Sequence, residues 1–240
     1  MRAACLQLRV DLCQKERNSA KALDMAKQAI DKGAEILVFP EMFITGFCYG
    51  ETPEEPPYPS LNPFEALAKD HDCLIIGSIM AEKYNFGFCL DPSGTTFQPK
   101  IHPFEQEKQH FLGGDSISPL KTKWGKVGLQ ICYDLRFPEV ARALALQGAD
   151  FLVTVGQFPA QRLAHWRVLC LARAIENQLP HLACNWANAG GSLIIDARGR
   201  VQAEAGQDSE EAIFGEVDYA MRDQWREEIF YLRERRPAVY

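Results

Sequence analysis

The sequence predicts an α/β fold in which helices cover β-strands on both faces. Strand-like and helix-like segments alternate along the 240 residues, and the order strand, helix, strand occurs in both halves. The strand-like segments are apolar over most of their length, so they need cover on both faces and indicate a layered architecture. A local echo between KGAEILVFPEMF (32–43) and QGADFLVTVGQF (147–158) further indicates an internally duplicated plan.

The elements of the first half follow from apolar spacing and from turn residues. The strands are continuous apolar runs, whereas the helices place apolar residues three and four positions apart. Gly33 ends the first helix, and the turn Asp91-Pro92-Ser93-Gly94 ends the last strand of this half. The predicted elements are a strand at 3–10, a helix at 17–33, a strand at 34–41, a short helix at 62–71, and paired strands at 73–82 and 86–95.

The second half repeats this order. Gly148 closes its first helix, and the turn of a hairpin falls near Arg198-Gly199. The predicted elements are a strand at 126–132, a helix at 136–148, a strand at 149–156, the longest helix at 159–178, a strand at 181–187, a hairpin at 192–205, and a last strand at 210–219 before a charged helix.

Composition predicts a soluble chain with a single domain spanning residues 1–240. Hydrophobic residues make up 47% of the chain and charged residues 24%, which allows a substantial core. The formal net charge of −6, without a basic patch, argues against nucleic acid or an anionic membrane as a partner. No run approaches the roughly 20 apolar residues that span a bilayer. The N-terminus lacks the features of a secretory signal, so a cytoplasmic location is expected.

The eight cysteines indicate neither a zinc site nor a disulfide framework. They form no C-x-x-C pair, and no histidine cluster stands beside them at metal-ligand spacing. In a cytoplasmic chain of this size they are expected to be reduced and mostly buried as small hydrophobic residues. Five of them lie in apolar runs, namely Cys5, Cys73, Cys89, Cys170 and Cys184.

Two reactive side chains end predicted strands, where ligands meet α/β folds. Cys132 ends a strand and precedes a helix, whose amide donors favour a thiolate and lower its pKa. Glu41 follows an apolar run and a proline, which suits a general base whose pKa is raised by apolar surroundings. The plainer alternatives are a buried strand cysteine and a loop glutamate that reaches solvent.

The segment QPKIHPFEQEKQHF adds a third candidate, Lys100. An inward-pointing lysine stabilises an oxyanion, but the same segment also reads as a solvated run of charge. His102, His165 and His181 are conceivable partners for a cysteine, and their spacing favours none of them.

These segments together resemble the nitrilase superfamily of carbon–nitrogen hydrolases. Cys132-Tyr133-Asp134, in place of the Cys-Trp-Glu of nitrile-hydrolysing members, is similar to the amidase branch related to ω-amidase and deaminated-glutathione amidase. The resemblance covers essentially the whole chain. Its segments are FPEMFITGF (39–47), PKIHPF (99–104), LQICYDLRFPEVAR (129–142), HWRVLCLARAIENQ (165–178) with Asn185, SLIIDARGRV (192–201) and RERRPAVY (233–240).

The resemblance implies a Glu–Lys–Cys triad. Glu41 would be the general base, Lys100 the cation that stabilises the oxyanion, and Cys132 the nucleophile. A second glutamate usually follows the lysine; Glu107 matches it best and Glu105 is the fallback. The resemblance also implies a four-layer α-β-β-α sandwich that forms homodimers or higher homo-oligomers through its helical face, and it requires no metal or organic cofactor.

The predicted reaction is hydrolysis of a small linear carboxamide to ammonia and a carboxylic acid through a cysteine thioester. Tyr133 is expected to contribute its backbone N–H to the oxyanion and to pack on the substrate. Phe47 and Phe158 are further substrate-binding candidates, and both equally suit the core. An N-carbamoyl amidohydrolase or a nitrilase would keep the triad and change the pocket. A catalytically silent binding protein and a redox or metal role for Cys132 are the remaining alternatives.

Overall fold

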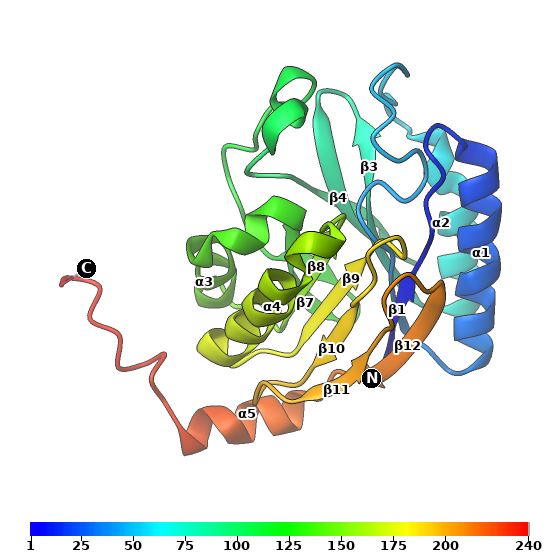
Figure 1. The fold of residues 1–240 in the computed structure, drawn as a ribbon. Coiled ribbons are helices and arrows are strands. Elements are labelled where there is room, and N and C mark those ends of the chain that lie inside the picture. Colours follow the sequence, from blue (N-terminus) through cyan, green and yellow to red (C-terminus); the bar gives the residue numbers. More distant parts are fainter. Residues whose placement is uncertain (240) are drawn as a thin grey trace.

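The computed structural model describes residues 1–239, which form two six-stranded β-sheets (Figure 1). The first sheet contains β1 (Arg2–Gln7), β2 (Ile36–Val38), β3 (Leu74–Ala81), β4 (Tyr84–Asp91), β5 (Gly94–Pro99) and β12 (Glu211–Glu216). The second contains β6 (Leu120–Thr122), β7 (Gly125–Ile131), β8 (Phe151–Gly156), β9 (His181–Asn185), β10 (Leu193–Ile195) and β11 (Val201–Glu204). The strand orders are β12-β1-β2-β3-β4-β5 and β11-β10-β9-β8-β7-β6.

Two pairs of helices cover the outer faces of the sheets. Helices α1 (Lys15–Asp31) and α2 (Asn62–His71) pack on the first sheet, and α3 (Pro138–Leu146) and α4 (Leu163–Asn177) pack on the second (Figure 1). Helix α5 (Tyr219–Glu228) follows β12, and the chain beyond it extends away from the body. The predicted four-layer α-β-β-α sandwich is therefore confirmed. Within residues 1–239, no helix is long and apolar enough to cross a membrane.

The central strands are largely apolar because both faces of each sheet are buried there. Along β1, Ala3 and Cys5 face the other sheet, whereas Ala4 and Leu6 face the helices. The same alternation in β2 sends Ile36 and Val38 between the sheets and Leu37 towards α1 and α2. Successive side chains of a strand point to opposite faces, so a strand between two apolar layers shows no polar side.

The strand order repeats in the two sheets. In the first sheet β1, β2 and β3 run parallel and β4 and β5 continue antiparallel, while β7, β8 and β9 followed by β10 and β11 repeat this pattern. The acids of the sequence echo have matching contacts. The backbone N–H of Arg2 donates to Glu35 Oε2 at 2.9 Å, and that of Lys126 donates to Asp150 Oδ2 at 2.8 Å. The structure thus carries the duplicated plan down to single hydrogen bonds.

Some element boundaries differ from the prediction for local reasons. Strand β2 is shorter than the predicted 34–41, because Pro40 has no N–H to continue the ladder. The helix predicted at 159–178 begins with a 3-10 turn at 160–162, and α4, with 15 residues, is shorter than α1, with 17. The sequence pattern does not predict β6 or most of β5, since these edge strands carry polar and partly exposed residues.

The prediction that the cysteines are reduced is wrong for one pair. Cys13 and Cys48 form a disulfide, with their Cα atoms 5.2 Å apart and a sequence separation of 35. The loop after β2 folds back over the start of α1, where the Cys13 N–H donates to the Thr45 carbonyl at 2.9 Å. This tertiary contact has no counterpart in sequence spacing. The five cysteines in apolar runs are free and buried, as predicted.

Candidate active site

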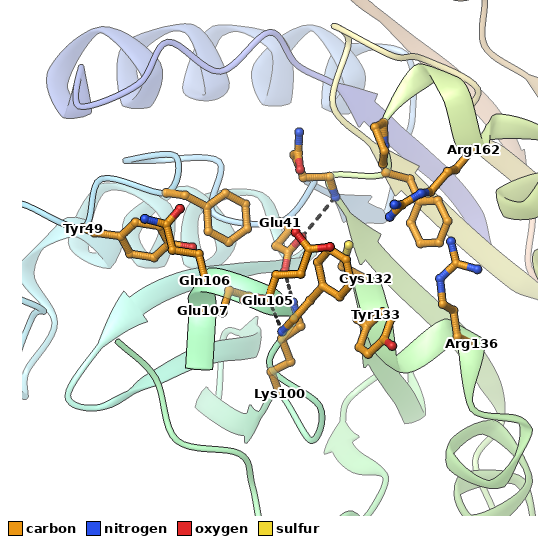
Figure 2. Close-up of a pocket in the computed structure, with 15 residues that line it drawn as sticks. Glu41, Tyr49, Lys100, Glu105, Gln106, Glu107, Cys132, Tyr133, Arg136 and Arg162 are labelled. Carbon is orange, nitrogen blue, oxygen red and sulfur yellow. Dashed lines mark hydrogen bonds and ion pairs between the residues drawn. The ribbon is translucent and has the colours of Figure 1, made fainter. Parts of the chain in front are cut away.

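Three of the proposed site residues follow strand ends at one edge of the sandwich. Lys100 comes directly after β5 and Cys132 directly after β7, while Glu41 lies three residues beyond β2. Their side chains border a cavity of about 240 Å³ (Figure 2). Aromatic and charged side chains complete its wall, namely Phe47, Tyr49, Phe104, Glu105, Glu107, Tyr133, Arg136, Phe158 and Arg162, together with Gln106, Gln157 and Pro159.

A buried ion-pair network forms one side of the cavity. Lys100 Nζ lies 2.7 Å from Glu41 Oε1 and 2.9 and 2.7 Å from the two carboxylate oxygens of Glu107. The lysine is 1% exposed, Glu41 is 0% and Glu107 is 4%. Burial this complete rules out a solvent-exposed Glu41 and a solvated Lys100. Two carboxylates share one ammonium, so the network depends on further hydrogen-bond donors.

Neutral donors complete the solvation of the two carboxylates. Asn85 Nδ2 donates to Glu41 Oε1 at 2.8 Å and to Glu107 Oε1 at 3.2 Å. The Gln157 N–H donates to Glu41 Oε2 at 3.1 Å, and the Phe104 N–H donates to Glu107 Oε2 at 2.8 Å. Each carboxylate is therefore held by both oxygens in one orientation.

Burial and mutual charge set the proton affinities of the three groups. Burial raises the pKa of the Glu41 carboxyl against the opposing charge of Lys100. Burial alone would lower the pKa of Lys100, but the charges of Glu41, Cys132 and Glu107 outweigh it and raise that pKa. Burial, followed by the charge of Glu41, raises the pKa of the Cys132 thiol well above its ordinary value. A thiol held neutral in this way needs a neighbouring base before it can attack.

Cys132 is the first residue of a five-residue 3-10 helix that directly follows β7. Its φ of 47° lies in the left-handed region, which is strained for a residue with a side chain. The Asp134 carboxylate accepts the His102 N–H at 2.9 Å, and Arg173 Nη2 donates to the Leu135 carbonyl at 2.7 Å, so both contacts brace this helix. The prediction that the helix start lowers the pKa of Cys132 is wrong in direction, because burial and Glu41 dominate.

The predicted substrate-binding residues all reach the cavity. Tyr133 and Phe47 are partly exposed in its wall, and Phe158 is 3% exposed, so it belongs to the core and to the wall alike. Of the two candidate second glutamates, the structure brings Glu107 to Lys100. Glu105 is exposed at the rim.

None of the three histidines considered as cysteine partners lines the cavity. His102 stacks on Phe137, and its Nδ1 lies 2.9 Å from the Asp134 carboxylate. His181 is buried against Thr154, and His165 is exposed on α4.

Sequence reasoning missed several residues of the site. Asn85 is a polar residue at the start of β4, beside the strand that leads to Lys100, and that placement is a usable signal only once the strands are paired. Arg136 ends the five-residue 3-10 helix that Cys132 begins, and both residues line the cavity. Arg162 ends the 3-10 turn at 160–162 and Tyr49 lies in the loop after β2, and the hydrophobic pattern marks neither of them.

Comparison with known proteins agrees with this fold. The family model described as carbon-nitrogen hydrolase matches residues 2–227. Omega-amidase NIT2 of Xenopus tropicalis is 32% identical over 254 residues, covering 94% of this chain and 92% of that protein. The 2-oxoglutaramate amidase of Bacillus subtilis (strain 168) is 32% identical over 256 residues, covering 99% and 98%.

A solved structure gives the same assignment. Saccharomyces cerevisiae Nit3, described as a member of branch 10 of the nitrilase superfamily, superposes with a TM-score of 0.89 at 26% identity. The match covers 95% of this chain and 94% of that one. With the family model matching almost its entire length, this chain belongs to the carbon-nitrogen hydrolase family, in the nitrilase superfamily, and is an enzyme that hydrolyses carbon–nitrogen bonds.

Proposed function

We propose that this enzyme hydrolyses the terminal carboxamide of a small carboxylic acid, with Cys132 as the nucleophile. One observation carries the proposal. The cavity holds a thiol beside a buried carboxylate–ammonium–carboxylate network on one side and two guanidinium groups, Arg136 and Arg162, on the other (Figure 2). The first side suits attack on an amide carbon, and the second suits a carboxylate.

Glu41 acts as the general base in the first half of the reaction. It takes the proton of Cys132 while the sulfur bonds to the amide carbon, and the carbonyl oxygen becomes an oxyanion. Lys100 and the backbone N–H of Tyr133 stabilise that oxyanion. Glu41 then gives the proton to the amide nitrogen, and the C–N bond breaks. Ammonia departs, and the acyl group remains on Cys132 as a thioester.

Water completes the reaction through the same groups. Glu41 takes a proton from water as the oxygen attacks the thioester carbon, and the C–S bond breaks. The proton returns to sulfur, the acid leaves and the free thiol is restored. Glu107 holds Lys100 in place through both carboxylate oxygens, so the ammonium stays directed at the reacting carbonyl.

The cavity favours a short substrate with a negative charge at its far end. A volume of about 240 Å³ admits a linear chain of a few carbons but little more. The Arg136 guanidinium lies 4.9 Å from the centre of the Phe158 ring and that of Arg162 lies 5.7 Å from the Phe104 ring, so stacking orients both. The relatives named omega-amidase and 2-oxoglutaramate amidase support an ω-amide with a distal carboxylate.

An assay of ammonia release tests this proposal. The panel contains monoamides of four- and five-carbon dicarboxylic acids, their methyl esters, and N-carbamoyl amino acids and nitriles of matched length. We expect the charged monoamides to react fastest and Cys132→Ala to abolish the reaction, while mass spectrometry detects an acyl group on Cys132. Full activity in Cys132→Ala would refute the mechanism. Faster turnover of the N-carbamoyl compounds or nitriles would refute the substrate class.

A further inference from the structure

The side chain of Asn85 bridges the two glutamates of the site. It is 0% exposed at the start of β4, and its Nδ2 lies 2.8 Å from Glu41 Oε1 and 3.2 Å from Glu107 Oε1. Within residues 1–239, no donor reaches its own Oδ1, although that atom is buried. An orphaned buried acceptor is costly, so its retention requires a reason. The reason is the direction of the amide, because a flipped side chain would set Oδ1 against two carboxylate oxygens.

The backbone fixes Asn85 opposite the lysine. The Lys100 N–H donates to the Asn85 carbonyl at 2.9 Å, where β4 and β5 pair. The two side chains therefore approach the same carboxylates from neighbouring positions. Glu41 Oε1 receives both Lys100 Nζ and Asn85 Nδ2, whereas Glu41 Oε2 receives the Gln157 N–H at 3.1 Å.

We propose that Asn85 is a positioning residue that occupies Oε1 of Glu41, leaving Oε2 as the oxygen that takes the thiol proton. The inference rests on the proposed function, in which Glu41 is the base. Asn85 also supplies a neutral donor to a network in which two carboxylates share one ammonium. A second lysine would compensate the charge of the Glu41 carboxylate and weaken it as a base. An amide stabilises the carboxylate form of Glu41 without adding a charge.

The effect on Glu41 follows from all the groups that face it. Lys100 favours the carboxylate form, whereas burial and the charge of Glu107 oppose it, and the thiol of Cys132 and the phenol of Tyr49 are the other titratable groups within its influence. Removing the Asn85 donor takes away part of the support for the charged form. The pKa of Glu41 then rises, and the acidic limb of the pH–rate profile moves to higher pH.

The test combines two variants with two measurements. Asn85→Leu keeps the approximate size and removes the donor, and Asn85→Asp replaces the donor with a third carboxylate. We expect kcat to fall about 10- to 100-fold, the range for a hydrogen bond to a charged group, with little change in KM and with the acidic limb shifted upwards in both variants. Asn85→Ser replaces any variant that does not fold, as judged by circular dichroism and thermal melting.

The second measurement needs no substrate. The rate at which iodoacetamide alkylates Cys132 is followed against pH, and the other free cysteines are buried, so labelling is selective. We expect the alkylation profile to shift upwards together with the kinetic one. If no amide is turned over, the proposed substrate fails, but the alkylation profile still decides the role of Asn85.

Asn177→Asp is the matched control. Asn177 is also 0% exposed and also has an unpaired buried Oδ1, but its Nδ2 contacts Arg173 and Glu176 at the end of α4. This change is expected to affect stability and leave the acidic limb in place. Folded Asn85 variants that keep the wild-type acidic limb in alkylation would overturn the inference.

Discussion

Removing the disulfide between Cys13 and Cys48 is expected to destabilise the protein strongly. The bond joins the segment before α1 to the loop that carries Phe47 and Tyr49 into the cavity. Reduction cuts this link without removing any packed side chain. The main effect therefore falls on the unfolded chain, which gains conformational freedom.

The size of the effect follows from the length of the closed loop. With a sequence separation of 35 residues, the loop-closure relation gives an entropy of about 13 cal/mol/K and a stabilisation of about 3.8 kcal/mol at 25 °C. An unfolding entropy of about 2.1 cal/mol/K per residue amounts to about 0.5 kcal/mol/K for this chain, so reduction should lower Tm by about 8 °C.

Thermal unfolding with and without dithiothreitol checks this value. Cys13→Ser and Cys48→Ser should melt about 8 °C below the oxidised wild type, the shift derived above, and should show no further response to the reductant. We also expect KM to rise on reduction, because the freed loop no longer holds two wall residues in place. A wild-type Tm that the reductant leaves unchanged would refute both the bond and the reasoning.

Four further predictions concern the site and the fold. Glu41→Gln should lower kcat/KM about 10²- to 10⁴-fold without loss of Tm at pH 8, and a wild-type rate in this variant would exclude Glu41 as the base. The acidic limb of the wild-type pH–rate profile should lie above the ordinary Glu pKa of 4.5, because burial raises the pKa of Glu41. Arg136→Met and Arg162→Met should each lower kcat/KM for a charged monoamide about 10- to 100-fold and leave its methyl ester unaffected, whereas equal losses for both substrates would contradict carboxylate binding. Burial lowers the pKa of His181 to about 4, so the unfolded state binds more protons than the folded state between about pH 6.5 and 4. The free energy of unfolding therefore falls by about 3 kcal/mol as pH drops through that window. Urea titrations at pH 7 and 4.5 should show a smaller loss for His181→Gln, and an unchanged loss would count against His181 as its origin. Val168, 63% exposed on α4, should lie in the interface of the predicted homodimer or higher homo-oligomer. Sedimentation velocity should therefore show a smaller species for Val168→Lys than for the wild type, and equal sedimentation would count against this interface.

Local pattern predicted the fold well because burial on both faces makes strands conspicuous. The duplicated plan was visible in one echo, since Glu35 and Asp150 make the same strand-end contact. The sequence pattern did not predict the edge strand β6 or most of the edge strand β5, because exposed edges tolerate polar residues. The hydrophobic pattern predicts strands that are buried, and it does not identify strands that are only partly buried.

The site was predictable where residues follow strand ends, and less so elsewhere. Lys100 resembled a solvated charge in sequence, and its burial depends on Asn85 and the two glutamates, which lie far apart in the chain. The pKa of the Cys132 thiol is raised, whereas the sequence predicted that it is lowered, because burial beside Glu41 outweighs the effect of the short helix start. Both outcomes depend on tertiary distances, and sequence spacing does not contain them.

The division of the site between the two sheets has a consequence for folding. Glu41 and Lys100 come from strand ends of the first sheet and Cys132 from the second, and the Glu41–Gln157 contact spans 116 residues. Contacts so distant along the chain form late, after the entropy of closing long loops has been lost. A partly folded chain with one sheet formed therefore has no reactive thiol–carboxylate pair. Recovery of activity during refolding should follow the slowest phase that joins the sheets, which makes catalysis itself a reporter of complete assembly.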